Sequence, residues 1–119
     1  MVLVLIGGGI GSVFRYLASV AAGRAFGDGF GWGTLIVNLV GCLLIGFIVG
    51  CVDRAFLAKT FRILLVSGFI GGFTTFSSFS LESVRFLQDN FAKGLANILL
   101  NVLGGLTLTL VGLWVADKI

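Results

Sequence analysis

The stretch GGFTTFSSFS, residues 71–80, decides the fold, because it interrupts an apolar segment that otherwise has the character of a membrane helix. Two glycines and five hydroxyl side chains stand among three phenylalanines, a poor composition for a lipid-facing helix. Glycine is unfavourable inside helices, and Ser and Thr compete for backbone hydrogen bonds. We therefore predict that a helix breaks in mid-membrane just before Thr74. The break frees backbone carbonyls, which protein, water or an ion must satisfy, and broken transporter helices use such carbonyls to hold Na⁺.

The rest of the chain is also typical of a membrane protein. It is 58% hydrophobic and 11% charged, whereas soluble domains are about 25% charged. About 20 apolar residues cross a bilayer core, and we predict four spans at 2–23, 33–52, 62–86 and 93–115. The predicted fold is one all-α transmembrane domain over 1–119, with short connections at 24–32, 53–61 and 87–92. Before the first apolar run there is no basic region, so we expect no cleaved signal peptide.

The positive charges are divided almost evenly between the two ends of the predicted bundle. One end carries Arg54, Lys59, Arg62 and Lys118, and the other carries Arg24, Arg85 and Lys93. The excess of Lys and Arg on one side of the membrane normally sets the orientation of the chain. Here the excess is too small to favour one orientation strongly. Either the chain inserts both ways and pairs as an antiparallel homodimer, or a weak bias selects one orientation. Four helices enclose little space, so transport would need an interface between copies, and we expect an oligomer.

Polar residues recur at four-residue spacing within the spans, which places them on single helix faces. The first span carries Gly7, Gly11 and Arg15, a small-residue packing face that includes an arginine. A central arginine costs about 2.5–3.5 kcal/mol on insertion scales. Arg15 therefore either faces protein or water, or reaches the membrane interface.

Three further features invite either a packing or a pathway interpretation. Thr34 and Asn38 share a face of the second span, and Asn97 and Asn101 share a face of the fourth. Such amides either join helices by hydrogen bonds or line a pathway, where their N–H groups suit an anion. Phe76 and Phe79, three residues apart, either pack ordinarily or present positive ring edges to a small anion. Glu82 continues that side of the helix.

Two patterns carry no predicted function. The N-terminal VLVLIGGGIGS only approximates a dinucleotide-binding fingerprint, and no alternation of strands and helices follows it. Cys42 and Cys51 lie on opposite faces of the second span, so they cannot bridge, and we interpret them as packing residues. The chain has no histidine and no nucleophile placed beside a base, so we do not expect an enzyme.

Taken together, these residues resemble the Fluc (CrcB) family of small bacterial fluoride channels over essentially the whole chain. The resemblance is carried by three segments: GIGSVFRY with Arg15, WGTLIVNLVG with Thr34 and Asn38, and SGFIGGFTTFSSFSLE at 67–82. It implies a dual-topology homodimer of antiparallel subunits in the bacterial plasma (inner) membrane, with two pathways for passive, electrogenic fluoride export. The expected surroundings are the lipid bilayer, and no nucleic-acid partner is expected.

The resemblance also implies roles for particular residues. The backbone carbonyls of Gly71 and Thr74, from both subunits, would hold a structural Na⁺ that is not transported. Fluoride would pass the ring edges of Phe76 and Phe79. The remaining implied residues are Asn38, Ser77 and Thr34 along the anion pathway, the acid Glu82 and the first-helix Arg15. The fourth helix of some relatives carries a tyrosine and a serine along its polar track. This sequence has Asn97 and Asn101 there, which also donate hydrogen bonds, and we expect both to line the anion pathway.

Other functions fit the sequence less well. A small multidrug exporter needs a carboxylate in its first span, and this first span has Arg15 and no acid. A fluoride–proton antiporter needs titratable groups along its route, and the asparagine rows do not titrate. A structural membrane subunit would explain the glycines but leave the asparagine rows and the Phe–hydroxyl patch without a purpose.

Overall fold

The computed structural model describes residues 1–27, 29–54 and 58–119, and these residues form helices joined by short connections. In chain order the elements are α1 (Val2–Phe26), α2 (Trp32–Asp53), α3 (Lys59–Arg62), the π-helix η1 (Ile63–Ile70), α4 (Gly71–Phe73), α5 (Phe76–Asp89) and α6 (Phe91–Lys118). The predicted all-α class is confirmed. The predicted connections at 24–32 and 53–61 include 28 and 55–57, which lie outside the described residues.

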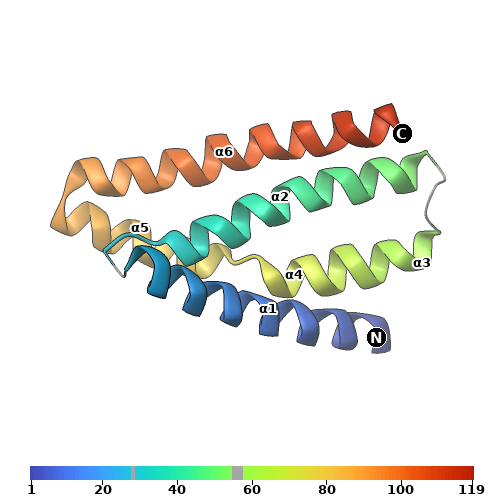
Figure 1. The fold of residues 1–119 in the computed structure, drawn as a ribbon, viewed down its shortest axis with the longest axis horizontal. Coiled ribbons are helices and arrows are strands. Elements are labelled where there is room, and N and C mark those ends of the chain that lie inside the picture. The colour runs from blue at the N-terminus through green and yellow to red at the C-terminus, as the bar shows by residue number, and fades with distance from the viewer. Residues whose placement is uncertain (28, 55–57) are drawn as a thin grey trace.

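Four stretches are long and apolar enough to cross a membrane, as predicted. They are Val2–Phe26, Trp32–Asp53, Lys59–Asp89 and Phe91–Lys118, and the third combines α3, η1, α4 and α5. The spans run side by side, with both termini at one end and the α5–α6 turn at the other (Figure 1). The longest dimension is 47 Å, similar to the thickness of a bilayer with its headgroups, about 40–45 Å.

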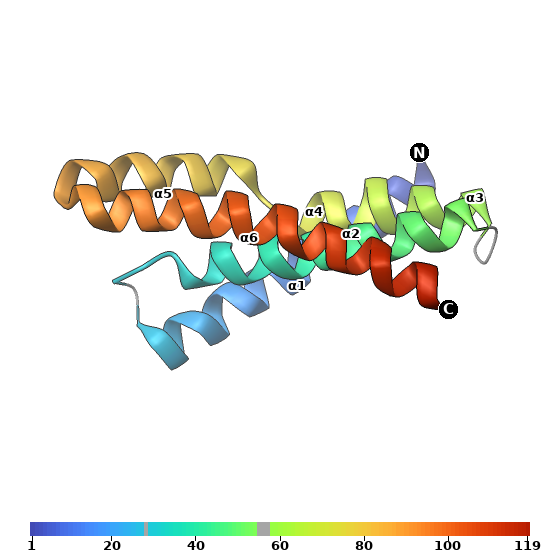
Figure 2. The ribbon, with the colours of Figure 1, turned by 90° about the horizontal axis from the view of Figure 1, so that it is seen from above.

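The second span is the centre of the chain. α2 packs against α1 on one side and α6 on the other, and α5 lies beside α6 (Figure 2). Within the described residues, α1 makes no close contact with α5 or α6. In the most apolar 18 residues of each helix, 39% of the α2 residues are buried, against 11% of those in α1 and 17% of those in α6. The outer faces of α1 and α6 are therefore left for lipid or a second copy, and the antiparallel homodimer stays a prediction.

The predicted small-residue face of the first span is confirmed by close helix packing. A Cβ at Gly7 would collide with the carbonyl oxygen of Leu64, and one at Gly11 with that of Phe69. The backbones of α1 and η1 approach closely there because neither glycine carries a side chain. The two cysteines are free, also as predicted.

The predicted break in the third span is present at Thr74 and Thr75. Thr74 has φ −82° and ψ 160°, and Thr75 has φ −150° and ψ 119°, which are extended conformations between α4 and α5. The eight-residue π-helix that precedes the break was not predicted. π-Helical turns are rare and are often found at functional sites.

Candidate ion pathway at the helix break

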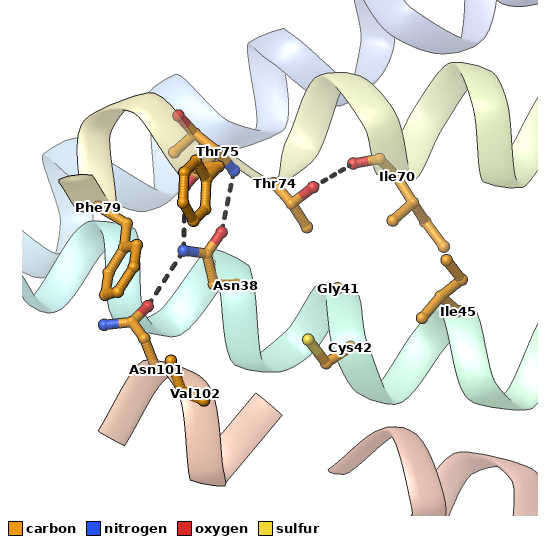
Figure 3. Close-up of a pocket in the computed structure, with 11 residues that line it drawn as sticks. Asn38, Gly41, Cys42, Ile45, Ile70, Thr74, Thr75, Phe79, Asn101 and Val102 are labelled. Atoms are coloured by element: carbon orange, nitrogen blue, oxygen red, sulfur yellow. Dashed lines mark hydrogen bonds between the residues drawn. The ribbon is translucent and has the colours of Figure 1, made fainter. Parts of the chain in front are cut away.

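The break opens beside a cavity of about 290 Å³, which we call the break cavity. Its walls come from α2, α6 and the two parts of the third span (Figure 3). The residues that matter for its chemistry are Asn38, Cys42, Thr74, Phe76, Phe79 and Asn101. No carboxyl, amino or guanidinium group is among its lining residues in the described part of the chain.

Asn38 is hydrogen-bonded to the backbone at the break. Its Oδ1 accepts from the Thr75 N–H at 2.9 Å, and its Nδ2 donates to the Thr75 carbonyl at 3.1 Å. The same Nδ2 donates to Asn101 Oδ1 at 3.1 Å, as Figure 3 shows. A side-chain amide nitrogen has two N–H groups, so both are used by protein acceptors. The Asn38 side chain thus supplies the Thr75 N–H with the acceptor that it lacks at the break, and also bonds the Thr75 carbonyl.

The break separates the Gly71 and Thr74 carbonyls from their helical donors. The α-helical donor for Gly71 would be the Thr75 N–H, which is bound to Asn38. The donor for Thr74 would be the Ser78 N–H, which instead bonds Thr75 Oγ1 at 3.2 Å. These are the two carbonyls expected to hold Na⁺. Oxygen ligands suit a hard cation, and no cluster of three or more His, Cys, Asp or Glu side chains occurs in the described residues.

Phe76 and Phe79 come together at the break cavity, on the first turn of α5. Their ring centroids lie 5.6 Å apart with an interplanar angle of 53°. Phe79 is 9% exposed, whereas Phe76 is 77% exposed within the single chain. The exposed Ser77 hydroxyl lies 3.4 Å from Thr75 Oγ1. The structure therefore brings Phe76, Phe79, Asn38 and Asn101 to one cavity.

Asn97 lies away from this cavity in a buried contact between α5 and α6. Its side chain is fully buried, and its Nδ2 donates to Ser83 Oγ at 2.9 Å. Ser83 was not singled out from the sequence. A usable signal existed, because Asn90 alone connects α5 to α6 and both residues lie seven positions from it. Residues equally distant from a tight helical turn meet across the pair.

Thr34 and Glu82 belong to a second cavity of about 300 Å³ near the α1–α2 connection, lined also by Ser19 and Arg85. Thr34 Oγ1 donates to Glu82 Oε1 at 2.8 Å. The other oxygen, Oε2, is buried without a hydrogen-bond partner among the described residues. It lies over Gly31, where a Cβ would collide with it. The carboxyl group thus sits at the N-terminus of α2, the positive end of the helix dipole.

Arg15 is not brought to either cavity. It is half-buried on α1 and lines neither the break cavity nor the second cavity. Its position on the glycine-bearing helix is as predicted, but any role in ion passage stays a prediction.

These features define a small multi-pass membrane protein with a broken span and an uncharged cavity at the break, an architecture suited to passing ions. The chain belongs to the CrcB family, since the model of "CrcB-like protein, Camphor Resistance (CrcB)" matches residues 2–113. A relative from Chelativorans sp. (strain BNC1), described as a fluoride-specific ion channel FluC, is 43% identical over all of this chain and 97% of its own length. A relative of the same description from Legionella pneumophila (strain Lens) is 44% identical over 98% of this chain and 88% of its own. The family resemblance found in the sequence is confirmed.

Proposed function

We propose that this chain is a fluoride-specific ion channel that passively exports F⁻ across the bacterial plasma membrane. The observation that carries the proposal is the break cavity, where two phenylalanines meet uncharged polar groups. Near-full-length similarity to relatives described as fluoride-specific ion channels supports it. An anion conducts only where its contacts are favourable enough for entry and weak enough for release. Neutral contacts meet that condition better than a fixed cation.

We propose that the ring edges of Phe76 and Phe79, with the Ser77 hydroxyl, contact fluoride at the break. Ring edges carry the positive part of the aromatic quadrupole. Asn38 faces the same cavity and would donate to the ion only by releasing one of its two acceptors. The Thr34 hydroxyl belongs to a separate site on the proposed route, in the second cavity beside Glu82.

The proposed assembly is an antiparallel homodimer around a structural Na⁺. The carbonyls of Gly71 and Thr74, released from helical bonding, supply the ligands from each subunit. Na⁺ would stabilise carbonyl dipoles that lack a backbone donor at membrane depth. The nearly even charges at the two ends of the chain support insertion in both orientations.

Fluoride efflux from liposomes tests the channel. Purified protein is reconstituted, a K⁺ ionophore is added, and released F⁻ is read with an electrode, with Cl⁻ run in parallel. Rapid F⁻ release that requires the ionophore, without Cl⁻ release, is the expected result. An intact, reconstituted protein that releases no F⁻ would contradict the proposal.

Thiol labelling tests the topology. Cys42 and Cys51 are replaced by alanine, and one cysteine is added after Ile119. Membrane-impermeant reagent should label comparable amounts from each membrane face. Labelling confined to one face would exclude dual topology while leaving the channel proposal standing.

A further inference from the structure

Five residues form a directional chain of hydrogen bonds that ends at the break. The Thr75 N–H donates to Asn38, Asn38 donates to Asn101 and Asn101 Nδ2 donates to Asn97 Oδ1 at 3.2 Å. Asn97 in turn donates to Ser83 at 2.9 Å. Each amide accepts at its oxygen and donates at its nitrogen, so the dipoles align head to tail. Aligned hydrogen bonds at low dielectric strengthen one another.

The fourth-span amides in this chain do not offer donors to the break cavity. Asn101 lines the cavity, yet its Nδ2 donates to the carbonyl oxygen and to Oδ1 of Asn97, at 2.9 and 3.2 Å. Asn97 is fully buried against Ser83. Both N–H groups of Asn101 are thus used within its own helix.

We propose that Ser83 and Asn97 are positioning residues, which act through Asn101 to hold Asn38 in the orientation that bridges the break. The orientation matters because an Asn amide presents a donor on one side and an acceptor on the other. Only one orientation lets Asn38 accept from the Thr75 N–H and donate to its carbonyl. That pairing keeps the Thr75 N–H away from Gly71. The inference rests on the proposed fluoride conduction for its flux readout only.

Removing the last acceptor tests the proposal. Ser83→Ala leaves the Asn97 amide without its acceptor and loosens the chain from its far end. The matched control is Thr109→Val. The Thr109 hydroxyl also joins α6 to α2, donating to the Cys42 carbonyl at 3.2 Å, but it lies outside the chain of amides. Ser83→Thr keeps the hydroxyl that accepts from Asn97, so it should retain the fluoride flux that Ser83→Ala loses.

Flux kinetics separate positioning from direct contact with the ion. Ser83→Ala should lower maximal fluoride flux about fivefold, the factor expected for one hydrogen bond, with the half-saturating fluoride concentration unchanged. Ser83→Thr should stay within about twofold of wild type, because it keeps the bond to Asn97. Thr109→Val should leave maximal flux near wild type. A Ser83→Ala variant that conducts like Thr109→Val, or an Asn97→Leu variant that raises the half-saturating concentration, would overturn the inference.

Hydrogen exchange gives a readout independent of transport. In Ser83→Ala, backbone exchange should accelerate in a peptide covering 74–79 while the α1–η1 contact keeps wild-type protection. Uniform acceleration, or none at 74–79, would overturn the proposal. If Ser83→Ala does not assemble, the double variant S83A/N97L removes both buried partners and should show the same local acceleration. Should wild type itself release no fluoride, the proposed function fails, while this exchange pattern still decides the positioning role.

Discussion

The two cavities share walls from α2 and α5 and differ in their electrostatics. The break cavity is lined by aromatic, aliphatic, amide and hydroxyl groups with no charged side chain among them. The second cavity, nearer the α1–α2 connection, holds Glu82 and Arg85 beside two hydroxyls. Charged walls keep water in a cavity, whereas neutral walls require an ion to lose water and accept weak replacements. The break cavity is thus suited to selection, and the second cavity to holding a hydrated ion.

The same contrast appears in what the α2 side chains do. Thr34 and Asn38 share one face, about 6 Å apart along the helix axis. Thr34 holds a carboxyl group, whereas Asn38 holds backbone groups exposed by the break. One helical turn therefore separates a charged site from a neutral one.

The largest effect is expected at the neutral cavity itself. Phe79→Ile removes the ring edge but keeps an apolar side chain, and should lower fluoride flux at least about tenfold, equivalent to about 1.4 kcal/mol. Liposome efflux of protein verified as a dimer measures it. Phe69→Ile is the control, because Phe69 stacks on Phe73 at 5.5 Å and does not line the break cavity. Equal losses in both variants would remove Phe79 from the pathway.

The fold could be predicted because its signals are local. Hydropathy over one helix length located all four spans, and the glycines and hydroxyls of 71–80 located the break. The π-helix could not be predicted, because Ile63–Ile70 is apolar apart from Ser67 and Gly68 and carries no breaker at its start. Close approach of Gly7 and Gly11 to its backbone is a tertiary contact.

The sequence predicted which residues line the site more completely than it predicted the hydrogen bonds that these residues make. Phe76 and Phe79 do share a cavity, as their spacing indicated. The sequence left open whether Asn97 and Asn101 join helices or line a route, since both uses need the same side chains. The answer depends on Ser83, which only the pairing of α5 with α6 brings into reach. Likewise, no local sequence pattern shows that Thr34 bonds a carboxyl group whereas Asn38, on the same helix face, bonds the backbone at the break.

A charge placed in the break cavity should remove the contrast between the two sites. Asn101→Asp keeps the oxygen that accepts from Asn38 but places an acid on the cavity wall. Repulsion of the anion should lower flux about fivefold, a smaller loss than that expected for Phe79→Ile. Asn101→Ser, which adds no charge, is the comparison for lost hydrogen bonding alone. Efflux of Asn101→Asp that equals wild type would place Asn101 away from the ion.

The smallest effect is expected from displacing the acid of the second cavity without removing it. Gly31→Ala puts a Cβ where Glu82 Oε2 lies, and the carboxyl group, at the end of a flexible side chain, should turn away from Thr34. Because only this flexible group must move, thermal stability should fall little. Gly29→Ala is the matched control, since a Cβ there meets open space. We expect Gly31→Ala to reproduce the flux of Glu82→Gln, about two- to threefold below wild type, the effect of one weakened polar contact. If Gly31→Ala conducts like Gly29→Ala while Glu82→Gln is impaired, the charge of Glu82 matters and its position over α2 does not.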